Sequence, residues 1–440
     1  MNLNVNELNI PFGKKAEDFR WLVSFEDAFV PQSRHADERP LDEYELTQHY
    51  RFWREDIERA RDLGVQMIRY GIPWYRVNPA KGRFDWEWTD KVVEHIVDRC
   101  GLELMVDLSH YNCPLWIDNE FINAGFPDYM AEYVRRFAER YGKSVFGYNP
   151  YNEPLPNALF SGQLGEWPPY LHGDDGFVKV IVNIAKAVVL NTRVIQDVHP
   201  SARIVHIEAS SVKEANDPEL RDLARLKNAR KFIVFELARG KIEEDRLLHG
   251  YLSENGVDDS VLAWFGERPI ELDIIGINYY PQLSRSVLVK SGPHVEEKKA
   301  LGYAEQLREI FLEYHKKYRR PMILTETSFW GTSDEKERWL EESCAVIREL
   351  RTRGVPIIGY NWWFMIDSIG WDYKWGDGDV SEYIGFLHPE GQKGPRKGAG
   401  LFTLKPDSDG SFRRVELPVA DTYRRIIKDA AHKVGDLDMK

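Results

Sequence analysis

The sequence predicts an α/β fold, a (β/α)8 TIM barrel that forms a single domain over residues 1–440. Eight short apolar runs alternate with longer amphipathic segments, which is the order expected of a parallel α/β sheet. The runs are continuously hydrophobic, as strands buried on both faces are. No glycine-rich phosphate turn, typical of an open doubly wound sheet, follows the first run. A closed barrel is therefore favoured.

The eight runs are predicted strands because they are rich in β-branched and aromatic residues over lengths typical of strands. In chain order they cover residues 20–25, 66–72, 102–108, 146–151, 202–208, 272–280, 322–326 and 356–365.

The segments between the runs have the apolar spacing of helices. Gly64, Gly142 and Gly354 each follow such a segment, and glycine is a common helix stop. The predicted helices cover residues 45–63, 89–100, 128–141, 176–198, 303–318 and 335–353, with a closing helix over 420–434.

Three connections are longer than the others. They cover residues 209–270, 281–301 and 367–419, and they follow the fifth, sixth and eighth predicted strands. Connections that follow barrel strands lie on the catalytic face. These long loops are therefore predicted to shape specificity.

The amino-acid composition indicates which cellular compartment and which binding partners to expect. The formal net charge of −12 argues against nucleic acid or an anionic membrane, because both attract clustered Lys and Arg. The three cysteines, Cys100, Cys113 and Cys344, are odd in number and widely spaced, which favours a reducing compartment. The N-terminus has no apolar run of signal-peptide length, and no stretch reaches the ~20 apolar residues of a membrane span. We expect a cytoplasmic protein that uses no cofactor, with homo-oligomerisation left open.

Two glutamates are the candidate catalytic residues. In a parallel barrel the active site lies at the carboxyl ends of the strands. Glu153 follows the fourth predicted strand, and Glu326 ends the seventh. Glycoside hydrolysis needs such a pair, since one carboxyl protonates the leaving oxygen and the other meets the oxocarbenium-like centre from the opposite face. Their separation decides between retention and inversion, and the sequence does not contain it.

Further polar and aromatic side chains stand at the ends of predicted strands. Alternation along a strand aims Trp362 and Trp363 in opposite directions, so only one of them can be a sugar platform. Asp107, His110 and Cys113 would need a second ligand cluster to form a metal site, and the sequence offers none, so no metal is predicted. The remaining side chains at strand ends are Arg69, Asn152, Asn278, Tyr279 and Tyr280.

The Asn152-Glu153-Pro154 segment resembles a known acid/base motif, and Thr325-Glu326-Thr327 resembles a known nucleophile segment. Both resemble motifs of clan A glycoside hydrolases, and of glycoside hydrolase family one in particular. These similarities run in order along most of the chain. The other matching segments cover residues 49–56, 69–77, 107–116, 276–280 and 359–371.

The resemblance implies a retaining mechanism on a β-type glycoside, with a carbohydrate as the partner. Glu326 would attack the anomeric carbon, and Glu153 would protonate the leaving oxygen and then deprotonate water. An arginine beside Glu326 would lower its pKa. The implied substrate contacts are Asn152 at the 2-hydroxyl, Arg69 and Tyr279 holding Glu326, His110 near the 3-hydroxyl, Trp363 under the glycone, and Trp371.

The chain departs from the family at the residues that would bind the 4- and 6-hydroxyls. The stretch 24–29 has no glutamine where the family has one, and Gly370 stands where the family has a glutamate. Glu26 or Asp27 could supply a new polar contact. We therefore expect a glycone other than plain glucose or galactose. A transglycosylase with the same carboxylates and a catalytically inactive sugar-binding barrel are the alternatives.

Overall fold

A computed structural model describes residues 19–385 and 396–435. Within these residues, eight parallel strands form one sheet in the order β6-β5-β4-β1-β13-β12-β9-β7. Isolated parallel bridges link Tyr148 to Ile204 and Asn152 to Ile207, and they bring the two edge strands together. The sheet thus curls almost completely into a barrel, and the predicted TIM barrel is confirmed.

Each predicted strand overlaps a barrel strand. Their continuous hydrophobicity reflects burial on both faces, against the barrel interior and against the outer helices. The barrel strands are β1 (Arg20–Ser24), β4 (Met67–Gly71), β5 (Glu103–Asp107), β6 (Val145–Asn149), β7 (Val205–Ala209), β9 (Ile274–Asn278), β12 (Met322–Thr327) and β13 (Ile357–Trp362).

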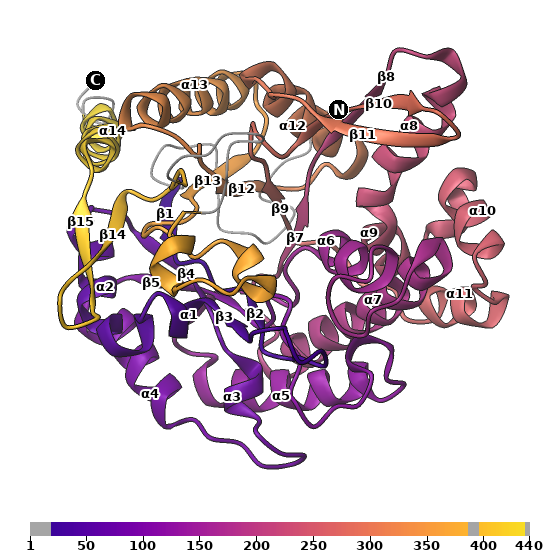
Figure 1. The fold of residues 1–440 in the computed structure, drawn as a ribbon, viewed down its shortest axis with the longest axis horizontal. Coiled ribbons are helices and arrows are strands. Elements are labelled where there is room, and N and C mark those ends of the chain that lie inside the picture. Colours follow the sequence, from indigo (N-terminus) through magenta and orange to yellow (C-terminus); the bar gives the residue numbers. More distant parts are fainter. Residues whose placement is uncertain (1–18, 386–395, 436–440) are drawn as a thin grey trace.

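Helices surround the strands (Figure 1). The seven predicted helices all overlap observed ones, and shorter helices lie in the connections. The α-helices of the described residues are α1 (Glu43–Leu46), α2 (His49–Asp62), α3 (Trp74–Val77), α4 (Glu87–Glu94), α5 (Phe126–Tyr141), α6 (Pro154–Ala158), α7 (Gly173–Val198), α8 (Arg221–Ala229), α9 (Ile233–Ala238), α10 (Arg246–Glu254), α11 (Asp259–Gly266), α12 (Ala304–Tyr318), α13 (Ser333–Thr352) and α14 (Pro418–Gly435).

The barrel interior is a packed core with buried side chains from seven strands and the partly buried Phe146 from the eighth, β6. Such a plug of branched and unbranched aliphatic side chains makes the barrel rigid below its catalytic face. Its buried members are Leu22, Met67, Met105, Val205, Ile207, Ile274, Ile323 and Ile358. A separate, larger hydrophobic cluster joins the outer faces of the strands to the helices.

Two of the long connections meet in a small sheet outside the barrel. The strand β8 (Val212–Ala215) follows β7, and the hairpin of β10 (Arg285–Ser291) and β11 (His294–Lys299) follows β9. They pair in the order β11-β10-β8, and Figure 1 shows them projecting together at one edge of the molecule.

The remaining strands lie in other connections. The two-stranded ladders are β2 (Phe29–Val30) with β3 (Leu41–Asp42), and β14 (Phe402–Pro406) with β15 (Phe412–Glu416). Every helix in the described part of the chain is too short or too polar to cross a membrane. The N-terminal segment in which no signal peptide is expected lies mostly outside the described residues.

Candidate active site

A cavity of about 380 Å³ opens at the carboxyl ends of the barrel strands. Both predicted catalytic glutamates, Glu153 and Glu326, line it. In the part of the chain that the structure describes, three other predicted site residues are buried behind the cavity wall and do not line it. They are Arg69, Asn152 and Tyr279. The other predicted site residues in the lining are Glu26, His110, Trp363 and Trp371.

Glu153 stands at the turn between β6 and α6. Its backbone φ of 44° is in the left-handed region, which is unusual for a residue other than glycine and is often found at functional sites. The amide of Asn278 donates to Glu153 Oε1 at 2.9 Å, and the hydroxyl of Tyr111 donates to Oε2. The carboxyl is thus fixed in the cavity by two neutral donors.

Glu326 lies near the end of β12, and its carboxylate has a cationic partner. Arg69 Nη1 is 2.7 Å from Glu326 Oε1. The hydroxyl of Tyr280 donates to Glu326 Oε2 at 2.8 Å. The carboxylate of Glu326 thus has one cationic and one neutral donor, whereas the two donors to Glu153 are neutral.

Arg69 connects several parts of the site from a fully buried position on β4. Its Nη2 lies 2.7 Å from Asp107 Oδ2 and donates to Asn152 Oδ1 at 2.7 Å. Burial lowers the pKa of Arg69, but Asp107 and Glu326 raise it above its ordinary value overall. The guanidinium therefore remains charged while it orients both Glu326 and Asn152.

The pKa of Glu326 differs from the sequence-based expectation. Burial raises the pKa of Glu326 well above its usual value, and the charge of Glu153 raises it further. Arg69 lowers this pKa, as expected, but does not outweigh burial. The net direction is upward because a fully enclosed carboxylate loses its hydration.

The contact with Glu326 that the sequence predicts for Tyr279 is made by its neighbour Tyr280. The hydroxyl of Tyr279 donates to the carbonyl oxygen of Tyr303 at 3.1 Å, on the outer side of the barrel wall. Tyr280 makes the contact with Glu326 that was predicted for Tyr279. The prediction for Tyr279 is therefore corrected.

Replacing Tyr280 with phenylalanine should lower kcat/KM roughly 10- to 100-fold, because a hydrogen bond to a charged group is worth about 1.5–3 kcal/mol. Loss of a donor to the ionised form also raises the pKa of Glu326. The acidic limb of the pH profile of kcat/KM should therefore move to higher pH. Tyr279→Phe is the matched control, with activity within about twofold of the native value. Equal losses in the two variants would contradict this assignment.

Another part of the cavity wall is formed by Glu26, His110 and Trp363, which contact one another. Trp363 Nε1 donates to Glu26 Oε2 at 3.2 Å, and the rings of His110 and Trp363 stack with centroids 5.3 Å apart. Burial raises the pKa of Glu26 to about 7, although the nearby His110 lowers it. Trp362 points elsewhere, since its Nε1 donates to the carbonyl oxygen of Ala399 at 3.0 Å. Trp363 alone of the two is thus available as a platform, as alternation predicts.

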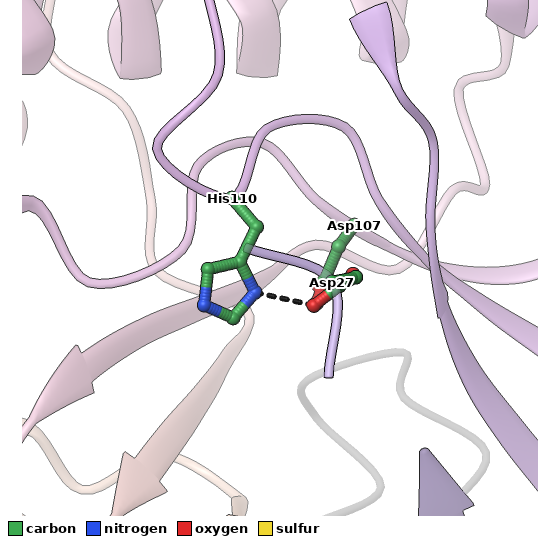
Figure 2. Close-up of side chains that lie close together, drawn as sticks. All are labelled: Asp27, Asp107 and His110. Carbon is green, nitrogen blue, oxygen red and sulfur yellow. Dashed lines mark ion pairs between the residues drawn. The ribbon is translucent and has the colours of Figure 1, made fainter. Parts of the chain in front are cut away.

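His110 belongs to a buried polar group with Asp27 and Asp107 (Figure 2). His110 Nδ1 is 2.5 Å from Asp27 Oδ1, and its Nε2 is 2.9 Å from Asn152 Nδ2. Ligand atoms of the three residues lie within 4.8 Å of one another, a spacing that metal sites also have. Here the guanidinium of Arg69 bonds to Asp107 and supplies a positive charge to the group.

The sequence reasoning missed three contacts of Glu153 and Glu326. Asn278 and Tyr280 stand two residues apart, so strand alternation placed them on one side and Tyr279 on the other. That signal was present in the sequence. Tyr111 lies in a loop with φ of 63°, and no periodic pattern indicates where its side chain points.

A TIM barrel with two glutamates in one cavity, at the ends of its fourth and seventh strands, is the architecture of a glycoside hydrolase. The family model described as Glycosyl hydrolase family 1 matches residues 20–282, which is more than half of the chain. The chain belongs to glycosyl hydrolase family 1, and it is accordingly a glycoside hydrolase of the retaining kind.

Individual relatives are distant in sequence. Beta-glucosidase A of Thermotoga maritima is 25% identical over 361 residues, which cover 73% of this chain and 78% of that protein. Galactolipid galactosyltransferase SFR2 of Arabidopsis thaliana is 24% identical and covers 74% of this chain, but only 53% of its own length is matched. The solved structure of beta-glucosidase from Thermotoga maritima with deoxynojirimycin has a TM-score of 0.76 at 18% identity, over 94% of this chain and 98% of that one. The last similarity shows the shared fold.

Proposed function

We propose that the protein cleaves a β-linked glycoside by double displacement, with Glu326 as the nucleophile and Glu153 as the acid/base. The observation that carries the proposal is the asymmetric support of two glutamates in one cavity. Glu326 is paired with Arg69, whereas the donors to Glu153 among the described residues are neutral. The similarity to a beta-glucosidase supports the same reaction.

In the first step Glu326 attacks the anomeric carbon while Glu153 gives its proton to the leaving oxygen. In the second step Glu153 takes a proton from water, and the water oxygen displaces Glu326. Arg69 and Tyr280 stabilise the carboxylate of Glu326 before attack and after release. Contacts of Asn152 with the 2-hydroxyl and of His110 with the 3-hydroxyl stay predictions, as does stacking of Trp363 under the sugar.

We propose further that the glycone is not plain glucose or galactose. At position 370 the family glutamate is replaced by glycine, and a Cβ there would lie 2.5 Å from Nη1 of Arg396. Arg396 is itself paired with Asp372, so a larger side chain at Gly370 would need this pair to shift. On the other side, Glu26 presents a carboxyl that can carry a proton or a charge near neutral pH. These two changes alter the groups available to the glycone hydroxyls.

A panel of 4-nitrophenyl β-glycosides tests the proposal. We expect hydrolysis of at least one member, and NMR of early time points should show the β-anomer as the first sugar product. An α-anomer formed first would mean inversion. Turnover of no member, together with equal sugar binding by the native protein and Glu326→Ala, would favour the sugar-binding alternative.

Glycosyl transfer is the second candidate function. The similarity to a galactolipid galactosyltransferase favours it, and transfer needs only that a hydroxyl replaces water in the second step. Running the panel with and without added sugar acceptor separates the two functions. Transfer predicts new glycosides that appear at the expense of free sugar.

We also propose a cytoplasmic location. Cys100, Cys113 and Cys344 are all described and are free thiols. Three unpaired cysteines suit a reducing compartment, where disulfides do not persist.

A further inference from the structure

The cavity carries opposite charges at its two ends. Glu26, Glu153 and Glu326 form an acidic end, with His110 beside them. The other end is basic, and the described residues that line it include four cations and a single carboxylate. These are Lys213, Lys227, Arg230, Lys299 and Glu297.

Topology places the basic end on the leaving-group side. The strands that carry Glu153 and Glu326 divide the barrel into two arcs, and β7 and β9 lie on the shorter one. The cations belong to the connections that follow β7 and β9, on β8, α8, β11 and the segment after α8. Glu26, His110 and Trp363 follow strands of the longer arc. Because the proposed glycone contacts His110 and Trp363 lie on the longer arc, the shorter arc faces the aglycone.

The carboxylate at the basic end does not neutralise the cations around it. Glu297 pairs with Lys213, lies 3.4 Å from Nζ of Lys227, and accepts from Ser286 Oγ at 2.8 Å. Burial alone would raise the pKa of Glu297, but Lys213 and Lys227 lower it to about 2. One ionised carboxylate is therefore shared between two ammonium groups. The described side chains that line this end keep a net positive charge.

Arg230 adds a buried cation to this end. Only 4% of the residue is exposed, and its guanidinium packs on the ring of Phe177 at 3.6 Å. Its Nη2 donates to the neutral Gln163 at 3.0 Å, and Nη1 is 3.7 Å from the half-exposed Asp174. Its Nε has no hydrogen-bond partner among the described residues. The protein therefore compensates this buried charge only in part, and an anion in the cavity that Arg230 lines would compensate it further.

Between the two ends the cavity wall is apolar. Its members come from α6, from the turn after it, and from the loops after β9 and β12. They are Leu155, Leu159, Phe160, Leu283 and Trp330. This wall favours an apolar or aromatic spacer between the glycosidic oxygen and any charged group.

The geometry points to an anion subsite for the aglycone: the substrate is a glycoside whose leaving group has an apolar body and a carboxylate or phosphate that binds between Lys213, Lys227, Lys299 and Arg230. This inference rests on the proposed function, because it takes Glu153 as the residue that protonates the leaving oxygen. The cations would position the aglycone and select it by charge.

The test compares a 4-carboxyphenyl β-glycoside with its neutral methyl ester and with a 4-phosphonooxyphenyl β-glycoside. The glycone is the one that the nitrophenyl panel selects, or glucose if it selects none. In the double variant Lys227→Gln/Lys299→Gln, the ratio of kcat/KM for acid to that for ester should fall about tenfold, or about 1.4 kcal/mol, because two ion pairs with the anion are lost. Intrinsic leaving-group reactivity cancels in this ratio of ratios. The larger effect with carboxylate or with phosphate identifies the anion.

Lys290→Gln/Lys298→Gln is the matched control, because it removes two charges from the same small sheet at residues outside the cavity lining. We expect it to leave the ratio within about twofold of the native value. Raising NaCl from about 0.02 M to about 0.5 M should weaken the native preference for the acid by screening. Hydrolysis of acid and ester with a ratio that neither variant nor salt changes would overturn the subsite and leave the proposed function standing.

Binding to Glu326→Ala reads the subsite without turnover. Calorimetry should show that the 4-carboxyphenyl glycoside binds about tenfold more weakly after Lys227→Gln/Lys299→Gln is added. Binding that is preserved in that triple variant would count against the subsite. Weaker binding combined with no hydrolysis of either glycoside by the native protein would instead defeat the proposed function.

Discussion

Replacing Glu326 with alanine is expected to lower kcat by at least about 10³-fold on an unactivated β-glycoside. The variant removes the carboxylate that Arg69 and Tyr280 hold in the cavity. The nucleophile proposed for the first step is then missing. The measurement is kcat on the glycoside that the nitrophenyl panel selects, with a thermal melt to show that the variant is folded.

Azide should rescue this variant, because a small anion can occupy the space left by the carboxylate. It would attack the anomeric carbon from the side of the missing nucleophile and give the α-glycosyl azide, which NMR identifies. Glu236→Gln is the matched control: Glu236 is a buried glutamate that accepts from Tyr318 at 2.8 Å outside the cavity, and its variant should keep activity within about twofold. Near-native turnover by Glu326→Ala, or a β-glycosyl azide, would refute the nucleophile assignment.

The barrel strands could be located from the sequence because burial on both faces leaves an uninterrupted apolar run. Their ends were less certain: the run 272–280 continues past β9, which ends at Asn278. Tyr280 extends the hydrophobic pattern of the strand, although its side chain lines the cavity. An aromatic residue at a strand end looks the same in a sequence whether it packs in the core or contacts a catalytic carboxylate.

The small sheet outside the barrel could not be predicted in the same way. The strand β8 pairs in parallel with β10, for example Arg285 with Val212, across more than seventy residues. Nothing local in either segment specifies that partner. The basic end of the cavity depends on this pairing, so the four cations that line it could not be grouped from the sequence.

The convergence of Glu153 and Glu326 on one cavity was predictable because parallel strands bring their carboxyl ends to one face. The supporting contacts depend on side-chain direction. Asn278 donates to Glu153 and Tyr280 to Glu326, whereas Tyr279 between them points outward. Strand alternation applied from Asn278 would have selected Tyr280. The pKa of Glu326 required the structure, since burial was the dominant influence and the sequence shows only the presence of an arginine.

Replacing Glu153 with glutamine should have an effect that depends on the leaving group. The substitution keeps the size of the side chain and removes the transferable proton. For a phenyl or alkyl β-glycoside, kcat/KM should fall by about 10²–10⁴-fold, the usual contribution of a general acid. For a dinitrophenyl glycoside it should change by less than about tenfold, because that leaving group needs no proton. A series of aryl glycosides of graded acidity measures this dependence.

The second step gives an independent check, because Glu153 is then the base that activates water. With a dinitrophenyl substrate, kcat and KM should therefore fall together as the glycosyl-enzyme accumulates. Azide needs no base, so it should restore kcat and give the β-glycosyl azide, the opposite anomer to the product of Glu326→Ala. The two variants thus yield azides of opposite configuration only if Glu326 attacks the sugar and Glu153 acts on the other face. An equal loss of kcat/KM for every leaving group would mean that Glu153 contributes to binding and not to proton transfer.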